Sequence, residues 1–232
     1  MSNTGRLSGT GGMPVLPFRA FDRNAPVAFY RRHLPHWRQP GCTYFVTYRL
    51  NDSIPKAKLQ QWEAQMAVWL RAHPQPHSEA EQREFHKQFI VRFHRWLDAG
   101  HGACWLRRAD VSNIVESALR YFDGERCILG HYVIMPNHVH ALVRPVMEFS
   151  LSDVLHSWKS YTANVINRSV SRCGTLWQDE SFDHIVRDES QLERFVRYID
   201  RNPAKAGLKA GEFRLGCGTG GVGQASNLSS ES

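Results

Sequence analysis

One segment, residues 127–144, constrains the fold of this chain most strongly. Residues 127–135 form an apolar run, Pro136 and Asn137 are a turn signal, and residues 138–144 alternate between polar and apolar side chains. Two β-rich runs joined by a tight turn are typical of an antiparallel hairpin. We therefore expect a sheet in which this hairpin supplies two neighbouring strands.

Strand and helix patterns alternate along the rest of the chain. The run TYFVTYRL at residues 43–50 predicts a strand. Helical periodicity predicts two helices within residues 56–97, joined around residues 74–76. Three later helices are expected to begin at the caps Ser112, Ser150 and Asp188, and the last to end at Pro203. A short strand is expected at residues 182–187. The pattern favours an α+β fold with an antiparallel sheet.

Length and composition indicate one globular domain. The chain has 232 residues, 42% of them hydrophobic, and contains no apolar run of the ~18 residues that a membrane span needs. We expect flexible tails at residues 1–14 and 216–232, and one domain at 15–215 with a helical insertion at 56–100. The first residues lack the apolar core of a secretory signal, so we expect a cytoplasmic protein without a membrane partner.

The charge balance favours a polyanionic partner. The net charge is +7, and 23 of the 29 basic residues are arginine. Arginine binds phosphates and stacks on bases, although a GC-rich genome would produce the same bias. The five cysteines include no Cys-x-x-Cys pair, which disfavours a zinc knuckle or a disulfide framework.

The motif His138-Val139-His140 is a candidate metal site. The two histidines are two residues apart on a predicted strand, so their imidazoles point to the same face of the sheet. The side chain of Val139 points to the opposite face, toward a core. Such a pair can bind a metal ion. The alternative is that both histidines are polar positions facing solvent.

Two tyrosines on predicted helices could act as a nucleophile. Tyr161 falls at helical spacing from Trp158, which favours a place in the core. Tyr198 lies at the edge of the apolar stripe of the last predicted helix. Asn202 follows it by four residues, so both side chains project from the same side of that helix. Asn202 could instead cap the helix before Pro203, and Tyr198 could be only a packing residue.

Three segments together resemble a family of DNA-processing enzymes. MPNHVHALV resembles the signature of the histidine-hydrophobe-histidine (HUH) single-strand endonucleases. WQDESFDHIVRD and VRYIDRNPAKAGL resemble the REP-associated tyrosine transposases of the IS200-like superfamily. The three motifs in this order are highly specific, and the resemblance runs from about Tyr44 to Leu208.

The resemblance implies a fold, a site and an activity. The fold is an antiparallel sheet flanked by helices, here with a helical insertion. Tyr198 is then the nucleophile, and His138, His140 and Asn202 bind a divalent metal, Mg²⁺ or Mn²⁺. The implied enzyme is a tyrosine transposase that cuts and rejoins single-stranded DNA at hairpins (repetitive extragenic palindromes) through a 5′-phosphotyrosine. We expect a bacterial, nucleoid-associated monomer.

Several residues around the predicted site are candidates for DNA contact. The arginines would neutralise phosphates, and the aromatic rings could stack on unpaired bases or simply pack in the core. The candidates are Lys159, Arg187, Arg197, Arg201, Trp177 and His184.

Two other functions compete with this interpretation. A domesticated hairpin-binding regulator would no longer cut DNA, but such a protein has no need of all four site residues. A zinc hydrolase could use the histidine pair, but it lacks a third histidine or an adjacent glutamate and leaves the tyrosine segment unexplained. The hairpin's bases, the cleaved dinucleotide and the preferred metal cannot be deduced from the sequence.

Overall fold

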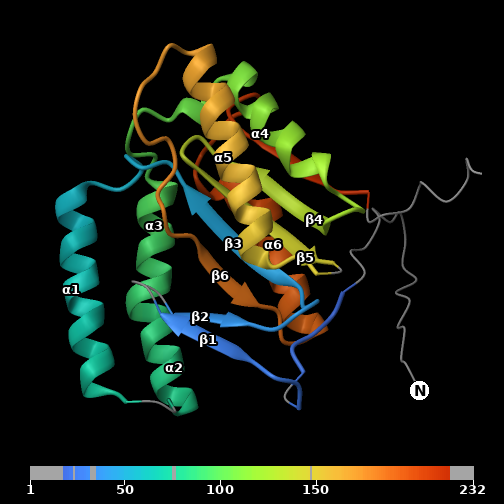
Figure 1. Cartoon of the computed structure of the whole chain (residues 1–232). Coiled ribbons are helices and arrows are strands. Elements are labelled where there is room, and N and C mark those ends of the chain that lie inside the picture. Colours follow the sequence, from blue (N-terminus) through green and yellow to red (C-terminus); the bar gives the residue numbers. More distant parts are fainter. Residues whose placement is uncertain (1–17, 23, 32–34, 75–76, 147, 220–232) are drawn as a thin grey trace, which may run out of the picture.

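The computed structural model describes residues 18–22, 24–31, 35–74, 77–146 and 148–219. The predicted tail at 1–14 and residues 220–232 of the second tail lie outside the described residues. A five-stranded antiparallel sheet forms the centre of the molecule, with the strand order β6-β3-β5-β4-β7 (Figure 1). Its strands are β3 (Tyr44–Arg49), β4 (Cys127–Ile134), β5 (His138–Pro145), β6 (Phe182–Ile185) and β7 (Arg214–Cys217). The predicted α+β antiparallel fold is confirmed.

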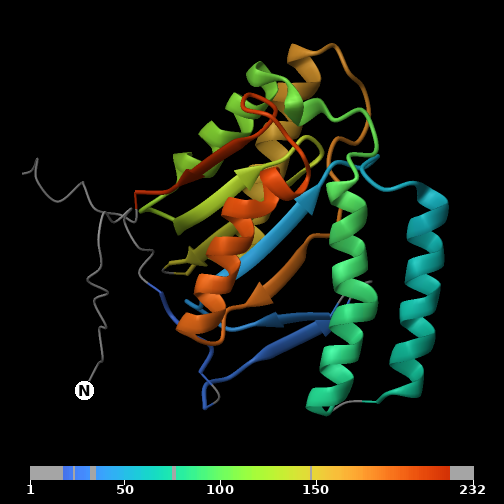
Figure 2. The same ribbon diagram turned by 180° about the vertical axis from the view of Figure 1, so that it is seen from behind.

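Different helices cover the two faces of the sheet. On one face, α4 (Ala109–Tyr121) and α5 (Leu151–Ser169) pack on a core that includes Val139 and Ala141 of β5. The other face is covered by α6 (Glu189–Lys205) (Figure 2). This helix packs on Phe45, Val133 and Leu142. Alternation along the strands divides the side chains between these two cores.

The predicted insertion forms a helical hairpin beside the β6 edge of the sheet (Figures 1 and 2). Its first arm is α1 (Lys56–Ala72). Its second arm joins α2 (Glu79–Phe85), a π-helical segment η1 (His86–Val91) and α3 (Arg92–Asp98). Buried aromatic side chains hold the two arms together, among them Trp62, Trp69, Phe89 and Phe93. The chain then enters α4 through a short 3₁₀ turn, η2 (Trp105–Arg107).

Several predicted helix ends are confirmed. Ser150 and Asp153 form a capping box at the start of α5, and the Asp188 side chain accepts from the backbone N–H of Gln191 at the start of α6. Because these caps satisfy N–H groups that have no partner within the helix, they are recognisable in sequence.

Two predicted helix ends are wrong. Ser112 lies inside α4, where its hydroxyl donates to the carbonyl of Arg108 at 3.1 Å, so the helix begins before it. Pro203 does not stop α6, which continues to Lys205. A proline removes only its own N–H bond, and the N–H of Ala206 still bonds to the carbonyl of Asn202 at 3.0 Å.

Three strands were not predicted. β1 (Ala28–Arg31) and β2 (Pro35–Arg38) form a separate two-stranded sheet. β7 pairs with β4 and includes Gly216 and Cys217, so the sheet extends past the domain end predicted at residue 215. These strands have four residues each, too few for a clear alternation. No helix within the described part of the chain is long and apolar enough to cross a membrane.

Candidate active site

The histidine pair lies on the α6 face of the sheet. β5 alternates as predicted, so His138 and His140 point toward α6 while Val139 points into the core beneath α4 and α5. Both imidazoles are fully buried. The alternative that these histidines face solvent is therefore wrong.

Each histidine ring is held by a neighbouring side chain. The Asn137 amide nitrogen donates to the carbonyl of His101 at 3.0 Å, which leaves its oxygen to accept from Nδ1 of His138 at 2.7 Å. Nδ1 of His140 lies 2.7 Å from the hydroxyl of Thr47, its cross-strand neighbour on β3. A hydroxyl can donate or accept, so Thr47 fits either tautomer of His140. Contacts of this kind orient the histidines of metal sites.

The two imidazoles present their Nε2 atoms to each other. These atoms are 3.0 Å apart. Burial lowers the pKa of His138 to about 3 and that of His140 well below its ordinary value, so both rings are neutral at pH 7. Neutral imidazole is the form that binds metal. If Nδ1 carries the proton on both rings, the lone pairs of the two Nε2 atoms point toward one position, where a cation could bind.

Asn202 is a buried amide one turn after Tyr198 on α6. Its side chain is 1% exposed, and neither its amide oxygen nor its amide nitrogen makes a hydrogen bond. Helix α6 is capped at Ala206, so the side chain of Asn202 does not serve as the cap. No cluster of three or more His, Cys, Asp or Glu side chains suited to a metal occurs among the described residues. A buried amide without hydrogen-bond partners is unusual, and its oxygen is compatible with the ligand role that the resemblance implies.

Tyr198 approaches this group from the same helix. Its hydroxyl lies 3.5 Å from Nε2 of His140, and its ring lies edge-on to that imidazole. Burial and then the nearby charge of Asp98 raise the pKa of Tyr198, and the neighbouring Asn202 amide offsets part of the rise. The phenol is therefore protonated in the protein without a bound cation. The side chain is partly exposed, so a substrate can reach it.

Tyr161 does not lie in the core as expected. It is 56% exposed on α5. The buried stripe of this helix runs through Trp158, Thr162 and Ile166, and Tyr161 falls beside it. Because α5 and the histidine pair lie on opposite faces of the sheet, Tyr161 is separated from the candidate site by the sheet itself.

His94 is a site neighbour that the sequence reasoning missed. It lies on α3 of the insertion, with its ring centroid 5.5 Å from that of His140 and 5.8 Å from that of Tyr198. Burial lowers its pKa to about 3. Thr47 was missed as well. A single histidine on a helix 44 residues before the His138 motif carries no local signal, whereas the place of Thr47 opposite His140 could be found once the strands were paired.

The three candidate arginines are exposed near the site or at the start of α6. Arg197 and Arg201 are exposed on α6, both on the same side of Tyr198, and Arg187 directly precedes the Asp188 cap. Arg197 also forms an exposed ion pair with Glu193 at 3.3 Å. These positions are compatible with contact to phosphates.

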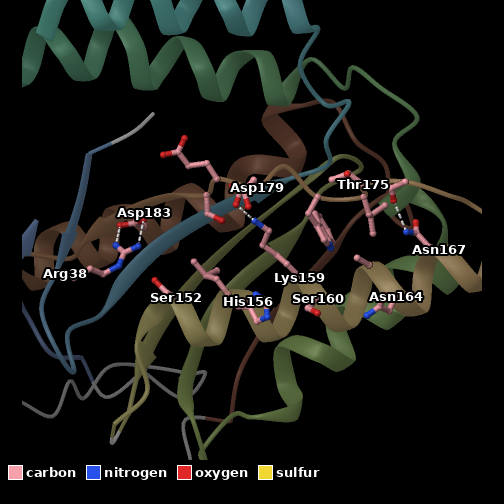
Figure 3. A pocket seen from close by; sticks show the side chains of 17 residues that line it. Arg38, Ser152, His156, Lys159, Ser160, Asn164, Asn167, Thr175, Asp179 and Asp183 are labelled. Carbon is pink, nitrogen blue, oxygen red and sulfur yellow. Dashed lines mark hydrogen bonds and ion pairs between the residues drawn. The ribbon is translucent and has the colours of Figure 1, made fainter. Parts of the chain in front are cut away.

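The other DNA-contact candidates lie elsewhere. Trp177 is 4% exposed and its Nε1 donates to Thr162, so it is a core residue, and stacking on a base does not fit. Lys159 donates to the carbonyl of Asp179 along a groove of about 710 Å³ between α5 and the segment before β6 (Figure 3). This groove opens on the α5 side, away from Tyr198. His184 packs against Phe195 near the start of α6.

The site agrees with one feature that the sequence resemblance implies. A buried His-x-His pair on a central strand faces a tyrosine on a helix. Residues 105–202 match the family model described as transposase IS200 like. The matched segment includes all four site residues and begins after the helical insertion.

Comparisons outside the family model add little detail. One solved structure, described as a REP-associated tyrosine transposase bound to a REP hairpin, is similar to this chain with 15% identity and a TM-score of 0.39. The similarity covers 78% of this chain and 74% of the other. No curated protein matches the chain.

Proposed function

We propose that this protein is a metal-dependent endonuclease and strand transferase that acts on single-stranded DNA at hairpins. The observation that carries the proposal is the 3.5 Å approach of the Tyr198 hydroxyl to the buried His138–His140 pair. A neutral histidine pair, an unbonded amide and a reachable phenol at one place suit a phosphodiester reaction at a metal. The match of residues 105–202 to the family model described as transposase IS200 like supports this choice of reaction.

His138, His140 and Asn202 would hold the divalent ion. When bound, that ion would act as a Lewis acid on the scissile phosphate and favour the phenolate of Tyr198. Asn137 and Thr47 orient the two imidazoles, which burial keeps neutral. The bond changes of the proposed reaction involve Tyr198 and the DNA.

The proposed reaction conserves the energy of the phosphodiester bond. The Tyr198 oxygen forms a bond to phosphorus, the bond from phosphorus to the 3′ oxygen breaks, the phenolic proton passes to solvent, and the leaving 3′ oxygen takes up a proton. The products are a 5′-phosphotyrosine and a free 3′ hydroxyl. A later attack by a 3′ hydroxyl reverses these bond changes and releases Tyr198, so no nucleotide triphosphate is consumed.

The substrate we propose is an unpaired strand next to a hairpin. The site face is bounded by α6 on one side and by the insertion on the other. Arg197 and Arg201 lie on the outer surface of α6, where they would neutralise phosphates of the approaching strand.

A covalent adduct tests the proposal directly. The protein is incubated with a hairpin-bearing single strand and Mg²⁺ or Mn²⁺, and intact-mass spectrometry measures the complex. We expect a protein–DNA adduct on the peptide that contains Tyr198, and none with Tyr198→Phe. An unchanged protein mass with bound and uncut hairpin would instead favour a binding protein that does not cleave.

A further inference from the structure

The helical insertion contacts α6, the helix that carries Tyr198, through two residues that are one turn apart on α3. Asp98 accepts from the ammonium of Lys205 on α6 at 2.9 Å, and its carboxylate is mostly buried. One turn earlier on α3, the ring of His94 faces Tyr198, with the centroids 5.8 Å apart and the planes inclined by 32°. The ammonium of Lys205 lies 5.9 Å from the Tyr198 ring. The insertion therefore reaches the candidate nucleophile itself and does more than enlarge the fold.

One ring nitrogen of His94 is buried without a hydrogen-bond partner. This atom, Nε2, is shielded from solvent. Aromatic rings of Phe45, Phe182 and Tyr198 lie around it at centroid distances of 5.5–6.5 Å. A phenylalanine would fill such a ring cluster without burying an unpaired nitrogen. Buried polar groups without partners are rare, and each one calls for a functional explanation.

The backbone before His94 is also unusual. The π-helical segment η1 ends at Val91, three residues before His94. A π turn contains an extra residue, which rotates the side chains after it by roughly 100° relative to a continuous α-helix. Segments of this kind occur frequently at functional sites, because they redirect side chains that follow. Here His94 and Asp98 follow η1, and both contact residues of α6.

Binding of a cation would remove the imidazole contact that the Tyr198 hydroxyl has in the structure. In the structure the only imidazole nitrogen within 3.5 Å of its hydroxyl, among the described residues, is Nε2 of His140. That nitrogen has a single lone pair, and a bound metal would use it. The other imidazole that touches the Tyr198 ring is His94, whose Nε2 is unpaired.

We infer that His94 is a positioning residue for the nucleophile, whose Nε2 accepts a hydrogen bond from the Tyr198 hydroxyl when a metal occupies the His138–His140 pair. This inference deepens the proposed function and rests on it. Its consequence is that the insertion, which lies outside the segment matched by the family model, completes the active site. The phenol is then held for attack by a residue from a different part of the chain.

Kinetics of three full-length variants test the inference. His94→Phe keeps the ring and removes both nitrogens, His94→Gln restores an acceptor, and His86→Phe changes an exposed histidine earlier in the same helical arm. Because loss of alignment at a nucleophile costs on the order of 10²-fold, we expect His94→Phe to lower kcat by about 10- to 100-fold with KM little changed. His94→Gln should recover much of the loss, and His86→Phe should cleave like the wild type.

Thermal unfolding distinguishes this role from a structural one. Since His94→Phe removes an unpaired buried nitrogen, its Tm should equal or exceed that of the wild type while its cleavage falls. Wild-type cleavage by His94→Phe, or equal losses in His94→Phe and His94→Gln, would overturn the inference while leaving the proposed function intact. Failure of the wild type to cleave any hairpin strand would count against the proposed function itself.

A spectroscopic measurement tests the contact without any cleavage. Long-range ¹H–¹⁵N spectra of the uniformly labelled protein report the shift of His94 Nε2, assigned by its loss in His94→Gln. We expect this nitrogen to shift upfield when Mg²⁺ is added to the wild type, as it accepts the phenolic proton, and to stay in place in Tyr198→Phe. The same shift in both proteins, or none in the wild type, would show that His94 does not bind Tyr198.

Discussion

The hydroxyl of Tyr198 and Nε2 of His140 lie 3.5 Å apart although 58 residues separate them in the sequence. The chain between them crosses the sheet as α5, returns along the β6 edge and then enters α6. Both residues end on the same face of the sheet, and neither belongs to a loop. The proposed nucleophile and the proposed metal-binding pair are both carried on regular elements and so have a fixed relative position, which would favour in-line attack on a bound phosphate.

Replacement of Tyr198 should separate cleavage from binding. Tyr198→Phe removes only the attacking oxygen, so we expect cleavage to fall on the order of 10⁴-fold or more and hairpin affinity to stay within a few-fold. Tyr161→Phe is the matched control, because this exposed phenol lies across the sheet from the histidines. Loss of cleavage in Tyr161→Phe and its survival in Tyr198→Phe would reverse the assignment.

Removal of the metal should stop the reaction reversibly. We expect a chelator to abolish cleavage by the wild type, and added Mg²⁺ or Mn²⁺ to restore it. The double variant His138→Ala, His140→Ala should be inactive and should not respond to added metal. Cleavage assays with a titrated chelator measure this, and full activity in excess chelator would exclude the metal-dependent mechanism.

Thr47 should tune the metal site without touching the metal. Thr47→Val removes the hydroxyl that bonds Nδ1 of His140, so we expect Mn²⁺ affinity to fall by about 10- to 100-fold in titration calorimetry. Thr162→Val is the control, since this buried threonine bonds Trp177 on the opposite face. Equal Mn²⁺ affinity in the wild type and Thr47→Val would show that the hydroxyl does not orient the ligand.

The helices and strands that carry the site could largely be predicted from the sequence, because their periodicity is strong. β5 with its turn at Pro136 and the capped helix α6 are such elements. The end of α6 was predicted too early because the sequence rule assigns Pro203 as a stop, whereas in the structure it falls in the last turn, where few bonds are lost. The exposure of Tyr161 depends on which side of α5 packs on the sheet. Tyr161 lies at the edge of the apolar stripe of this helix, so its position in the sequence does not decide whether it is buried.

The approach of His94 to Tyr198 could not be predicted at all. It results from the packing of a whole helical hairpin against α6, through the Asp98–Lys205 ion pair and the aromatic rings near Phe182. Contacts between distant segments leave no periodic pattern in either segment.

Stability should fall as the pH falls below about 6.5. Burial lowers the pKa of His184 to about 4, so below pH 6.5 the unfolded chain binds a proton that the folded protein excludes. At pH 5 this histidine should cost about 2 kcal/mol relative to pH 7.5, because one pKa unit corresponds to about 1.4 kcal/mol. Urea unfolding at the two pH values measures the difference, and His184→Gln should reduce it. An equal loss of stability in His184→Gln and the wild type would contradict the assignment.

The polarity of the covalent product tests the central claim most directly. A single strand that carries a hairpin is labelled at its 5′ end in one sample and at its 3′ end in another, and each is incubated with protein and Mg²⁺. On a denaturing gel we expect the protein to retain the fragment 3′ of the cut, joined through its 5′ phosphate to Tyr198, while the other fragment leaves with a free 3′ hydroxyl. Perfect duplex should resist, because opening it costs on the order of 1.4 kcal/mol per base-pair step. Retention of the fragment 5′ of the cut, or equal cutting of perfect duplex, would contradict the account.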